Sequence, residues 1–394
     1  MTFLANFNEV SSRLGTFSTQ WDFVQDRFGE KDLLPFSISD MDFPIPAGTA
    51  QVLKEAVDKG YFGYTRWNHM PFKSSITHWF QSQFMTAVPE EAVLYSPSVI
   101  YSLSVCLQLL SQPQDKVVTF TPCYDAFFHC IKQNQRELIT FDLTNEAGNF
   151  TIDFERLAQV FQLQAPRVFL LCNPHNPTGR VFTEQELLKL IALCNEYKVA
   201  LISDEIHMDV RRPGFMHLPI LKYKDYCETD LVLLSSPSKT FNTPGLGGSY
   251  LIVEAEALRQ QFLEVLKGRD GLSSVPYLSL LATMDCYRNQ SQWVAELNQT
   301  VDDNFSYLKT ELQKDPRIQF TIPEATYLAW IDVSQLPTTM DVLQNKLIHE
   351  EKVAIMRGDT YGEAGQGFLR LNLGAPLSKI KAGTAKLLRV ASSL

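Results

Sequence analysis

The sequence lacks the features that mark membrane, secreted and nucleic-acid-binding proteins. No apolar run reaches the roughly 18 residues needed to cross a bilayer. The N-terminal stretch MTFLANFNEV has neither the basic start nor the apolar core of a secretory signal. Acidic side chains (44) outnumber lysine and arginine (35), and no tract is strongly basic. Nucleic acids and membranes are therefore not expected among the partners.

Paired cysteines are also missing. The chain has seven cysteines, and none of them forms a C-x-x-C pair. A disulfide framework or a zinc knuckle is not expected, and neither is any other metal site, whereas reduced thiols are typical of the cytoplasm. We therefore expect a soluble cytoplasmic protein.

What the sequence does contain is a series of short, continuously apolar runs. A chain of 394 residues exceeds the usual size of a single core, so two domains are expected. Runs without polar alternation are typical of strands covered on both faces. Six such runs follow one another: 116–121 (KVVTFT), 137–141 (ELITF), 167–172 (RVFLLC), 199–203 (VALIS), 231–235 (LVLLS) and 249–253 (SYLIV).

A helix signal separates two of these runs. Thr183 and Glu186 form a capping-box pattern that opens the amphipathic stretch LLKLIALCNEY. Strand, helix and strand in this order predict parallel βαβ units and hence an α/β fold. We expect a large α/β domain over residues 47–287. Residues 1–46 and 288–394 would form a smaller α+β domain with a long helix near 290–313, strands near 326–333 and 368–373, and a final helix.

Small and aromatic residues follow the first strands, where ligands bind in open α/β sheets. After the apolar residues 93–95, Ser98 and Val99 open a helical stretch whose free N–H groups could hold a phosphate. An ordinary helix cap would explain the same residues. Tyr124 follows the run 116–121 and could cover a flat ring, although local packing of a rim aromatic is an equal alternative.

Amide, carboxylate and imidazole groups follow the next two strands. Asn176 lies in the turn NPHNPTGR, where two Asn-Pro steps fix the backbone. Asp204 comes directly after an apolar run, and a carboxylate in that place is costly unless it meets a cation. His207 follows three residues later and is as well explained by a structural role as by a ligand contact.

A single lysine follows the strand at 231–235. Lys239 lies in the stretch SSPSKTFNTPGLGG, among small polar residues and glycines. A lysine at a desolvated strand end has a lowered pKa and a nucleophilic amine. A surface lysine in a loop is the competing interpretation of this residue alone.

Together these groups match one cofactor. Pyridoxal 5′-phosphate needs a phosphate cradle, a lysine for its aldehyde, a carboxylate for its ring nitrogen, a donor for its phenolate oxygen and a stacking partner for its ring. The combination predicts a pyridoxal-phosphate enzyme.

Beyond this set, the motifs NPHNPTGR, SDEIHMD and SPSKTFN resemble those of fold-type I pyridoxal-phosphate enzymes of the aspartate aminotransferase superfamily. The stretches SDMDF (39–43), GYTRW (63–67), TPCYDAF (121–127) and GFLRLNLG (367–374) resemble the MalY/PatB-type carbon–sulfur β-lyases, which are cystathionine β-lyase-like. The resemblance covers nearly the whole chain. It implies a mostly parallel, seven-stranded sheet covered by helices, beside a smaller α+β domain.

The resemblance also implies roles for individual residues. Lys239 would bond to the cofactor aldehyde and act as the base, Asp204 would hold the ring nitrogen, and Tyr124 would stack on the ring and take part in catalysis. Arg370 would grip the substrate carboxylate, and Tyr64 would reach the site of a neighbouring subunit, which implies a homodimer. The remaining cofactor contacts would come from Ser98, Val99, Asn176, His207 and Ser236, with Asn176 and Tyr64 also near the substrate.

Two positions depart from the pattern of the superfamily. Gly247 stands where many members have an arginine that clamps phosphate, and the turn at 96–98 has Ser98 in place of an expected glycine. The phosphate would then depend more on hydroxyl and backbone groups.

The expected reaction is α,β-elimination of L-cystathionine, cystine, cysteine or another S-substituted cysteine to pyruvate, ammonia and a thiol. An aminotransferase would use the same lysine and carboxylate, and an enzyme-like regulator that binds a protein partner is a third hypothesis. The group that would bind a distal substrate carboxylate is left open, with Arg66, Trp67 and the 357–366 loop as candidates.

Overall fold

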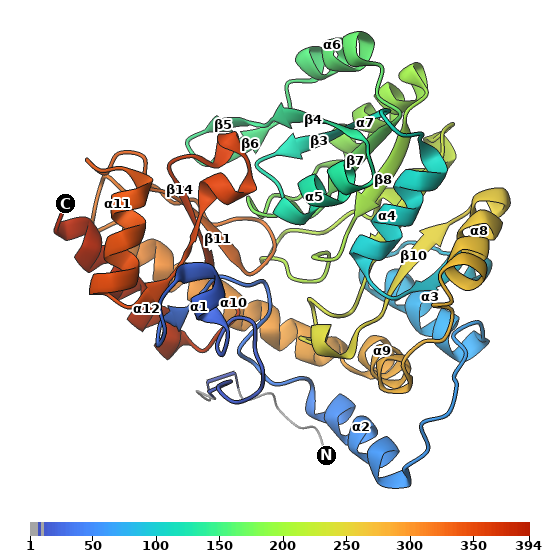
Figure 1. Ribbon diagram of the computed structural model, residues 1–394, viewed down its shortest axis with the longest axis horizontal. Helices are drawn as coiled ribbons and strands as arrows, with labels where there is room; N and C mark the ends of the chain where they lie inside the picture. Colours follow the sequence, from blue (N-terminus) through green and yellow to red (C-terminus); the bar gives the residue numbers. More distant parts are fainter. Residues whose placement is uncertain (1–6, 9–11) are drawn as a thin grey trace.

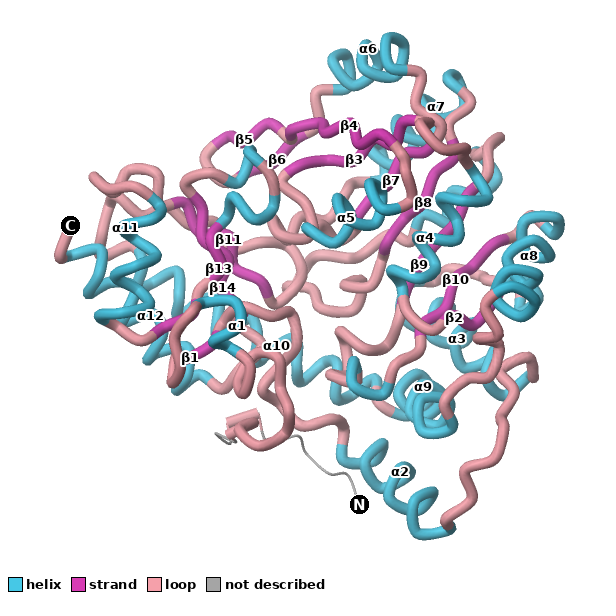
Figure 2. Tube along the Cα trace, viewed as in Figure 1, coloured by secondary structure: helices cyan, strands magenta, loops and turns pink. Residues whose placement is uncertain are grey.

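A seven-stranded sheet forms the centre of the computed structural model, which describes residues 7–8 and 12–394. The strand order is β2-β10-β9-β8-β7-β3-β4 (Figures 1 and 2). Only β10 runs antiparallel to its neighbours, and the other paired strands are parallel. The expected mostly parallel sheet is therefore confirmed. Its strands are β2 (Val93–Ser96), β3 (Lys116–Thr121), β4 (Glu137–Asp142), β7 (Val168–Cys172), β8 (Ala200–Asp204), β9 (Leu231–Ser235) and β10 (Ser249–Val253).

Burial on both faces explains the continuous apolar runs of these strands. Every residue of β7, β8 and β10 is buried. Helix α4 (Val99–Leu110) packs against β8, β9 and β10, while α7 (Glu184–Tyr197) packs against β8. The other helices of this part are α2 (Ala47–Lys59), α3 (Met70–Phe84), α5 (Asp125–Gln133), α6 (Phe154–Gln164), α8 (Glu256–Leu263) and α9 (Tyr277–Asn289).

The predicted element boundaries agree closely with the observed ones. Strands β3, β9 and β10 have the expected bounds, β4 and β7 differ by one residue at one end, and β8 is shifted by one residue at both ends. The capping box is formed, because the Thr183 hydroxyl accepts from the Glu186 N–H and the Glu186 carboxylate accepts from the Thr183 N–H. Local signals were therefore sufficient to place these elements.

A second group of strands lies away from the large sheet (Figure 2). Strands β11 (Leu328–Asp332), β14 (Phe368–Asn372) and β13 (Met356–Arg357) form an antiparallel sheet. Strand β1 (Leu34–Pro35) pairs with β12 (Val353–Ala354), which brings the N-terminal segment to this part of the molecule. Strands β5 (Thr144–Glu146) and β6 (Asn149–Thr151) form a separate antiparallel hairpin.

Helices α10 (Ser291–Leu312) and α12 (Leu377–Ser392) pack against each other beside this sheet. They match the expected long helix and final helix, and the remaining helices are α1 (Val24–Phe28) and α11 (Met340–Asn345). Within the described residues, no helix combines the length and the apolar character that crossing a membrane requires. The division into domains at residues 47 and 287 stays a prediction.

Candidate active site

One cavity of about 620 Å³ lies at the carboxyl ends of the central strands. It collects side chains that follow β2, β3, β7, β8 and β9, as expected for an open α/β sheet. Nine of the ten predicted site residues line it: Ser98, Val99, Tyr124, Asn176, Asp204, His207, Ser236, Lys239 and Arg370. Tyr64 does not line it, and its side chain is fully exposed on this chain.

Lys239 is held at the centre of this cavity. Its Nζ donates to the carbonyl oxygen of Ser39 at 2.5 Å. Burial is the main cause that lowers the pKa of Lys239 to about 8, and the nearby Arg370 lowers it further. The negative charges of Asp40 and Asp204 act in the opposite direction. A substantial fraction of this amine is therefore neutral near pH 8 and able to act as nucleophile or base.

Asp204, the last residue of β8, is buried in the same cavity. Burial raises the pKa of its carboxyl group to about 7. The N–H of Ile206 donates to Asp204 Oδ1 at 3.1 Å and partly offsets this effect. A cationic ring nitrogen beside Asp204 would stabilise the ionised form.

Arg370 lies on β14 and reaches the cavity from the smaller sheet. Its Nη1 donates to Asn176 Oδ1 at 3.2 Å, and its Nη2 donates to the carbonyl of Ser37 at 2.6 Å. Its guanidinium carbon lies 4.7 Å from the centre of the Tyr361 ring. The buried Nε of Arg370 has no hydrogen-bond partner among the described residues, so this guanidinium can still donate to a ligand.

Imidazole and phenol groups complete the inner wall. His207 is buried with its Nδ1 unpartnered, and burial, followed by the charge of Lys239, lowers its pKa to about 3. The ring is therefore neutral at physiological pH. Tyr124, at the start of α5, is half-buried, and burial raises the pKa of its hydroxyl group.

The expected phosphate end is formed by the N-terminus of α4. The Ser98 hydroxyl caps this helix by accepting from the N–H of Tyr101 at 3.1 Å, which leaves its own proton free to be donated to an anion. The Ser236 hydroxyl instead donates to the Gly248 carbonyl (2.9 Å) and accepts from the Ser238 N–H (3.1 Å), so it also fastens the lysine loop. Gly247 lines the cavity and carries no charge in the place of a phosphate-clamping arginine.

Sequence reasoning missed the segment that crosses this cavity, residues 37–43, which we call the strap. Carbonyl groups along the strap accept hydrogen bonds from site residues or their neighbours. Ser37 binds Arg370, Ser39 binds both Lys239 and the Tyr327 hydroxyl, and Met41 binds Asn242. The stretch SDMDF had been singled out only as a family motif, because carbonyl contacts leave no pattern in side-chain types.

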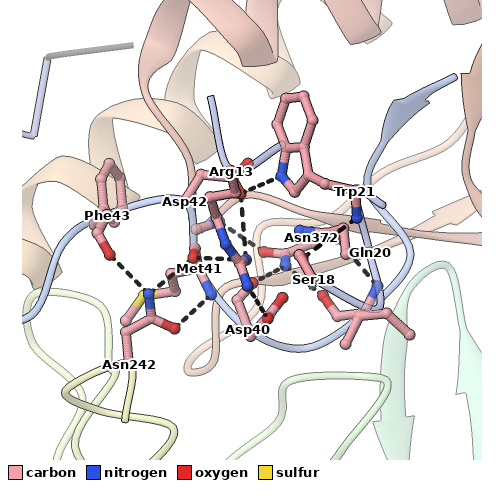
Figure 3. Close-up of polar contacts among 12 residues, drawn as sticks. Arg13, Ser18, Gln20, Trp21, Asp40, Met41, Asp42, Phe43, Asn242 and Asn372 are labelled. Carbon is pink, nitrogen blue, oxygen red and sulfur yellow. Dashed lines mark hydrogen bonds and ion pairs between the residues drawn. The ribbon is translucent and has the colours of Figure 1, made fainter. Parts of the chain in front are cut away.

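Side chains on both sides hold the strap in place (Figure 3). Asn242, three residues after Lys239, bonds through its side chain to the Met41 N–H and to the carbonyls of Met41 and Phe43. Asn372, two residues after Arg370, donates to the carbonyls of Ile38 and Asp40. The strap is thus fixed both to the lysine loop and to β14.

Two carboxylates of the strap itself form a second set of contacts. Arg13 pairs with Asp40 at 2.7 Å and approaches Asp42 at 3.5 Å. Asp42 also accepts from Trp21 Nε1 at 2.7 Å and forms an ion pair with Lys379. Figure 3 shows Arg13 and Trp21 reaching Asp40 and Asp42 from a separate part of the chain.

Of the candidates for a distal carboxylate site, only the 357–366 loop reaches the cavity of its own chain. Arg66 and Trp67 are absent from the described cavity lining, whereas Tyr361 of the 357–366 loop is part of it. Arg357 is already paired with Asp341 and Asp359. A different arginine, Arg27, lines the cavity, and no motif in the sequence had pointed to it.

The cavity fits pyridoxal phosphate on its own chemistry. A half-buried amine with a lowered pKa and a buried carboxyl group with a raised pKa occupy one cavity, together with unpartnered nitrogen atoms of His207 and Arg370. A ligand with an aldehyde and a basic ring nitrogen would pair with the lysine and the carboxylate at once. The capped N-terminus of α4 provides for its phosphate.

Comparison with known proteins gives the same assignment. Residues 31–386 match the family model "Aminotransferase class I and II". Protein MalY of Escherichia coli K12 is 42% identical over 97% of this chain and 98% of its own length. Cystathionine beta-lyase PatB of Bacillus subtilis 168 is 35% identical, with the same two coverages. The solved structure of a PLP-bound C-S lyase from Staphylococcus hominis is 28% identical, with a TM-score of 0.92 and 98% of both chains covered. The chain belongs to the aminotransferase class I and II family of pyridoxal-phosphate enzymes.

Proposed function

We propose that this protein is a pyridoxal-phosphate-dependent carbon–sulfur β-lyase. Its substrates are L-cystathionine and related S-substituted cysteines. In the net reaction the Cβ–S bond breaks, Cα loses a proton and water is consumed, which yields a thiol, pyruvate and ammonium. The observation that carries the proposal is the presence of the half-buried Lys239 and the buried Asp204 in one cavity. The names of two relatives at 42% and 35% identity favour the lyase over an aminotransferase.

Each predicted site residue receives a role in this proposal. When bound, the cofactor supplies an electron sink for the negative charge that develops at the substrate Cα. Lys239 would hold its aldehyde carbon, Asp204 its ring nitrogen and Asn176 its phenolate oxygen, while Tyr124 would cover its ring. Ser98, Val99 and Ser236 would hold its phosphate, and His207 would lie beside Asp204 and Lys239 as a neutral ring.

Proton transfer at Cα is assigned to Lys239. Its amine is partly neutral near pH 8, and one of its hydrogens is directed at the Ser39 carbonyl, which orients the nitrogen. Arg370 binds the substrate α-carboxylate with the guanidinium group that Ser37 and Asn176 already orient. Together the two residues fix where Cα lies relative to the base.

A homodimer and a cytoplasmic location also belong to this proposal. Tyr64 is fully exposed, and its neighbours Tyr61 and Phe62 are 81% and 55% exposed. This aromatic surface supports contact with a second copy, in which Tyr64 would reach the partner's cavity. All seven cysteines are free, and six of them are buried, which supports a reducing compartment.

The test is Lys239→Ala in the cofactor-loaded enzyme. We expect loss of pyruvate formation from L-cystathionine and loss of the visible absorbance of the lysine-bound cofactor. Lys222→Ala, on the surface, is the matched control and should retain both. Normal pyruvate formation by Lys239→Ala would overturn the assignment, and a requirement of the wild-type enzyme for an added keto acid would point to an aminotransferase.

A further inference from the structure

The outer part of the active-site cavity contains a second arginine. Arg27, on α1, lines the same cavity as Arg370, but its side chain is exposed rather than buried. Its Nη1 donates to Met356 Sδ at 3.5 Å, which is a weak acceptor. In the part of the chain that the structure describes, no carboxylate lies within ion-pair distance of this guanidinium. Arg27 therefore has most of its donors available.

Met356 places Arg27 close to the proposed α-carboxylate site. Met356 and Arg370 are directly opposite each other in the antiparallel pair of β13 and β14. Residues in this position have Cα atoms about 4.5–5.5 Å apart and point to the same face. The contact with Met356 thus keeps Arg27 beside Arg370 and further toward solvent.

Tyr361 gives independent evidence that the two arginines are near each other. Its buried ring lies against Arg370. Burial raises the pKa of Tyr361 to about 12, and the positive charges of both Arg370 and Arg27 act against this rise. Both guanidinium groups therefore lie near the Tyr361 hydroxyl group.

A negatively charged residue also lines this cavity. Asp125, the first residue of α5, is half-buried and lines the cavity. Its charge is felt by Tyr124 and Tyr361, the same rings that sense Arg27. No cation within the described ranges pairs with it. The cavity thus presents a positive and a negative group, each unpaired, beyond the buried Arg370.

We infer that Arg27 and Asp125 form a distal subsite for a zwitterionic leaving group. Arg27 binds the far carboxylate of the substrate and Asp125 binds its far ammonium, while Arg370 holds the α-carboxylate. The preferred substrates are then thioethers or disulfides with an amino acid at both ends, such as L-cystathionine and L-cystine, rather than S-alkyl cysteines. This inference rests on the proposed lyase function and names the residues that would bind the distal end of its substrates.

The test compares four substrates of the cofactor-loaded enzyme by pyruvate formation. L-Cystathionine carries both distal charges, S-(2-carboxyethyl)-L-cysteine only the carboxylate, S-(2-aminoethyl)-L-cysteine only the ammonium, and S-propyl-L-cysteine neither. Arg27→Gln should lower kcat/KM about 10-fold for the two substrates with a distal carboxylate, as expected for loss of one charged hydrogen bond. The ratio of kcat/KM for the aminoethyl substrate to kcat/KM for the propyl substrate should stay within about twofold of its wild-type value.

Asp125→Asn should give the reciprocal pattern, with losses for cystathionine and the aminoethyl substrate. Arg27→Lys should recover part of the loss, because it restores the charge without the planar donor pair. Arg357→Gln is the matched control, since that guanidinium is already paired with Asp341 and Asp359. This variant should leave the order of the four substrates by kcat/KM unchanged.

The outcomes separate the subsite from the reaction. Equal loss for all four substrates in Arg27→Gln, or no loss for any, would overturn the subsite while the lyase proposal stands. Absence of pyruvate from every substrate with the wild-type enzyme would overturn the lyase proposal and the subsite with it. Selective loss for the distal carboxylates, mirrored by Asp125→Asn, would support the inference.

Discussion

Replacing Asp42, a residue of the strap, by asparagine should destabilise the fold. The Asp42 carboxylate accepts from Trp21 Nε1 at 2.7 Å and pairs with Lys379, and the two charged side chains are 3% and 6% exposed. Asparagine keeps an oxygen for Trp21, but it turns an N–H₂ group or a neutral oxygen toward the Lys379 ammonium. The substitution therefore leaves a buried cation without a counter-charge.

The magnitude follows from the burial of that cation. Removing one partner of a buried ion pair typically costs about 3–5 kcal/mol. The Lys379 ammonium also lies 4.6 Å from the Trp21 ring and 4.7 Å from the Phe36 ring, and these contacts remain. Cation–π contacts are worth about 0.5–2 kcal/mol, so the lower end of the range applies. We expect Asp42→Asn to cost about 3 kcal/mol.

A double-mutant cycle measures this effect. Urea unfolding of the wild type, Asp42→Asn, Lys379→Met and the double variant should be followed at one protein concentration and one cofactor concentration, because both change apparent stability. The double variant should be more stable than Asp42→Asn, since it no longer buries an unpaired ammonium. A loss below about 1 kcal/mol in Asp42→Asn, which is typical of exposed pairs, would refute the reasoning. So would a double variant no more stable than Asp42→Asn.

Two further predictions concern the cofactor pocket. Without cofactor, Asp204→Asn should be more stable than the wild type at pH 8. The advantage should shrink by about 3 kcal/mol at pH 5 in urea unfolding, because the raised pKa of about 7 lets the folded state keep a proton that the unfolded state loses, at about 1.4 kcal/mol per pH unit. An advantage that did not change with pH would contradict this. Thr240→Val should lower the free energy of unfolding by about 2 kcal/mol in the same assay, because the Thr240 hydroxyl donates to the buried Asp209 carboxylate at 2.6 Å. Thr240→Ser keeps this hydroxyl and should therefore retain most of the wild-type stability. Equal stability of the valine and serine variants would disprove this role of the bond.

The sign of the Asp204 effect follows from its environment. A carboxyl group whose folded pKa is above its unfolded value contributes stability at low pH and loses it as pH rises through the folded pKa. Lys239 behaves in the opposite sense, because its lowered pKa of about 8 costs stability as pH falls through that value. Between pH 7 and 8 both groups are charged at least in part. The combined free-energy cost of burying these two charges in the cofactor-free pocket is therefore largest in that pH range.

Much of the fold could be predicted from local patterns. Fully buried parallel strands give continuous apolar runs, and the bounds of β3, β9 and β10 were therefore visible in the sequence. The antiparallel direction of β10 was not, because strand direction depends on connections that hydrophobic patterns do not record. The pairing of β1 with β12 joins residues more than three hundred positions apart and leaves no local signal either.

The site residues also fall into those that the sequence could place and those that it could not. Residues directly after strands, such as Asp204 and Asn176, could be placed because the carboxyl ends of parallel strands meet at one edge of a sheet. Arg27 could not, because it reaches the cavity from α1, whereas Tyr361 lies in the 357–366 loop, which the sequence indicates as a candidate. Tyr64 was predicted from the resemblance and lies outside the cavity of its own chain, so its role depends on a second copy.

The strap gives a physical reason why Lys239 and Arg370, the proposed base and the proposed substrate anchor, stay at a fixed distance from each other. Lys239 lies on the loop after β9 of the large sheet, and Arg370 lies on β14 of the small one. Their side chains nevertheless donate to carbonyl groups only two residues apart in one segment, at Ser39 and Ser37. Any shift of that segment moves both acceptors together, so the distance between the proton acceptor and the carboxylate anchor changes less than the distance between the two sheets. The buried charges of Asp42 and Lys379 then act on catalysis only through the strap, which is why their cost should be largest in stability.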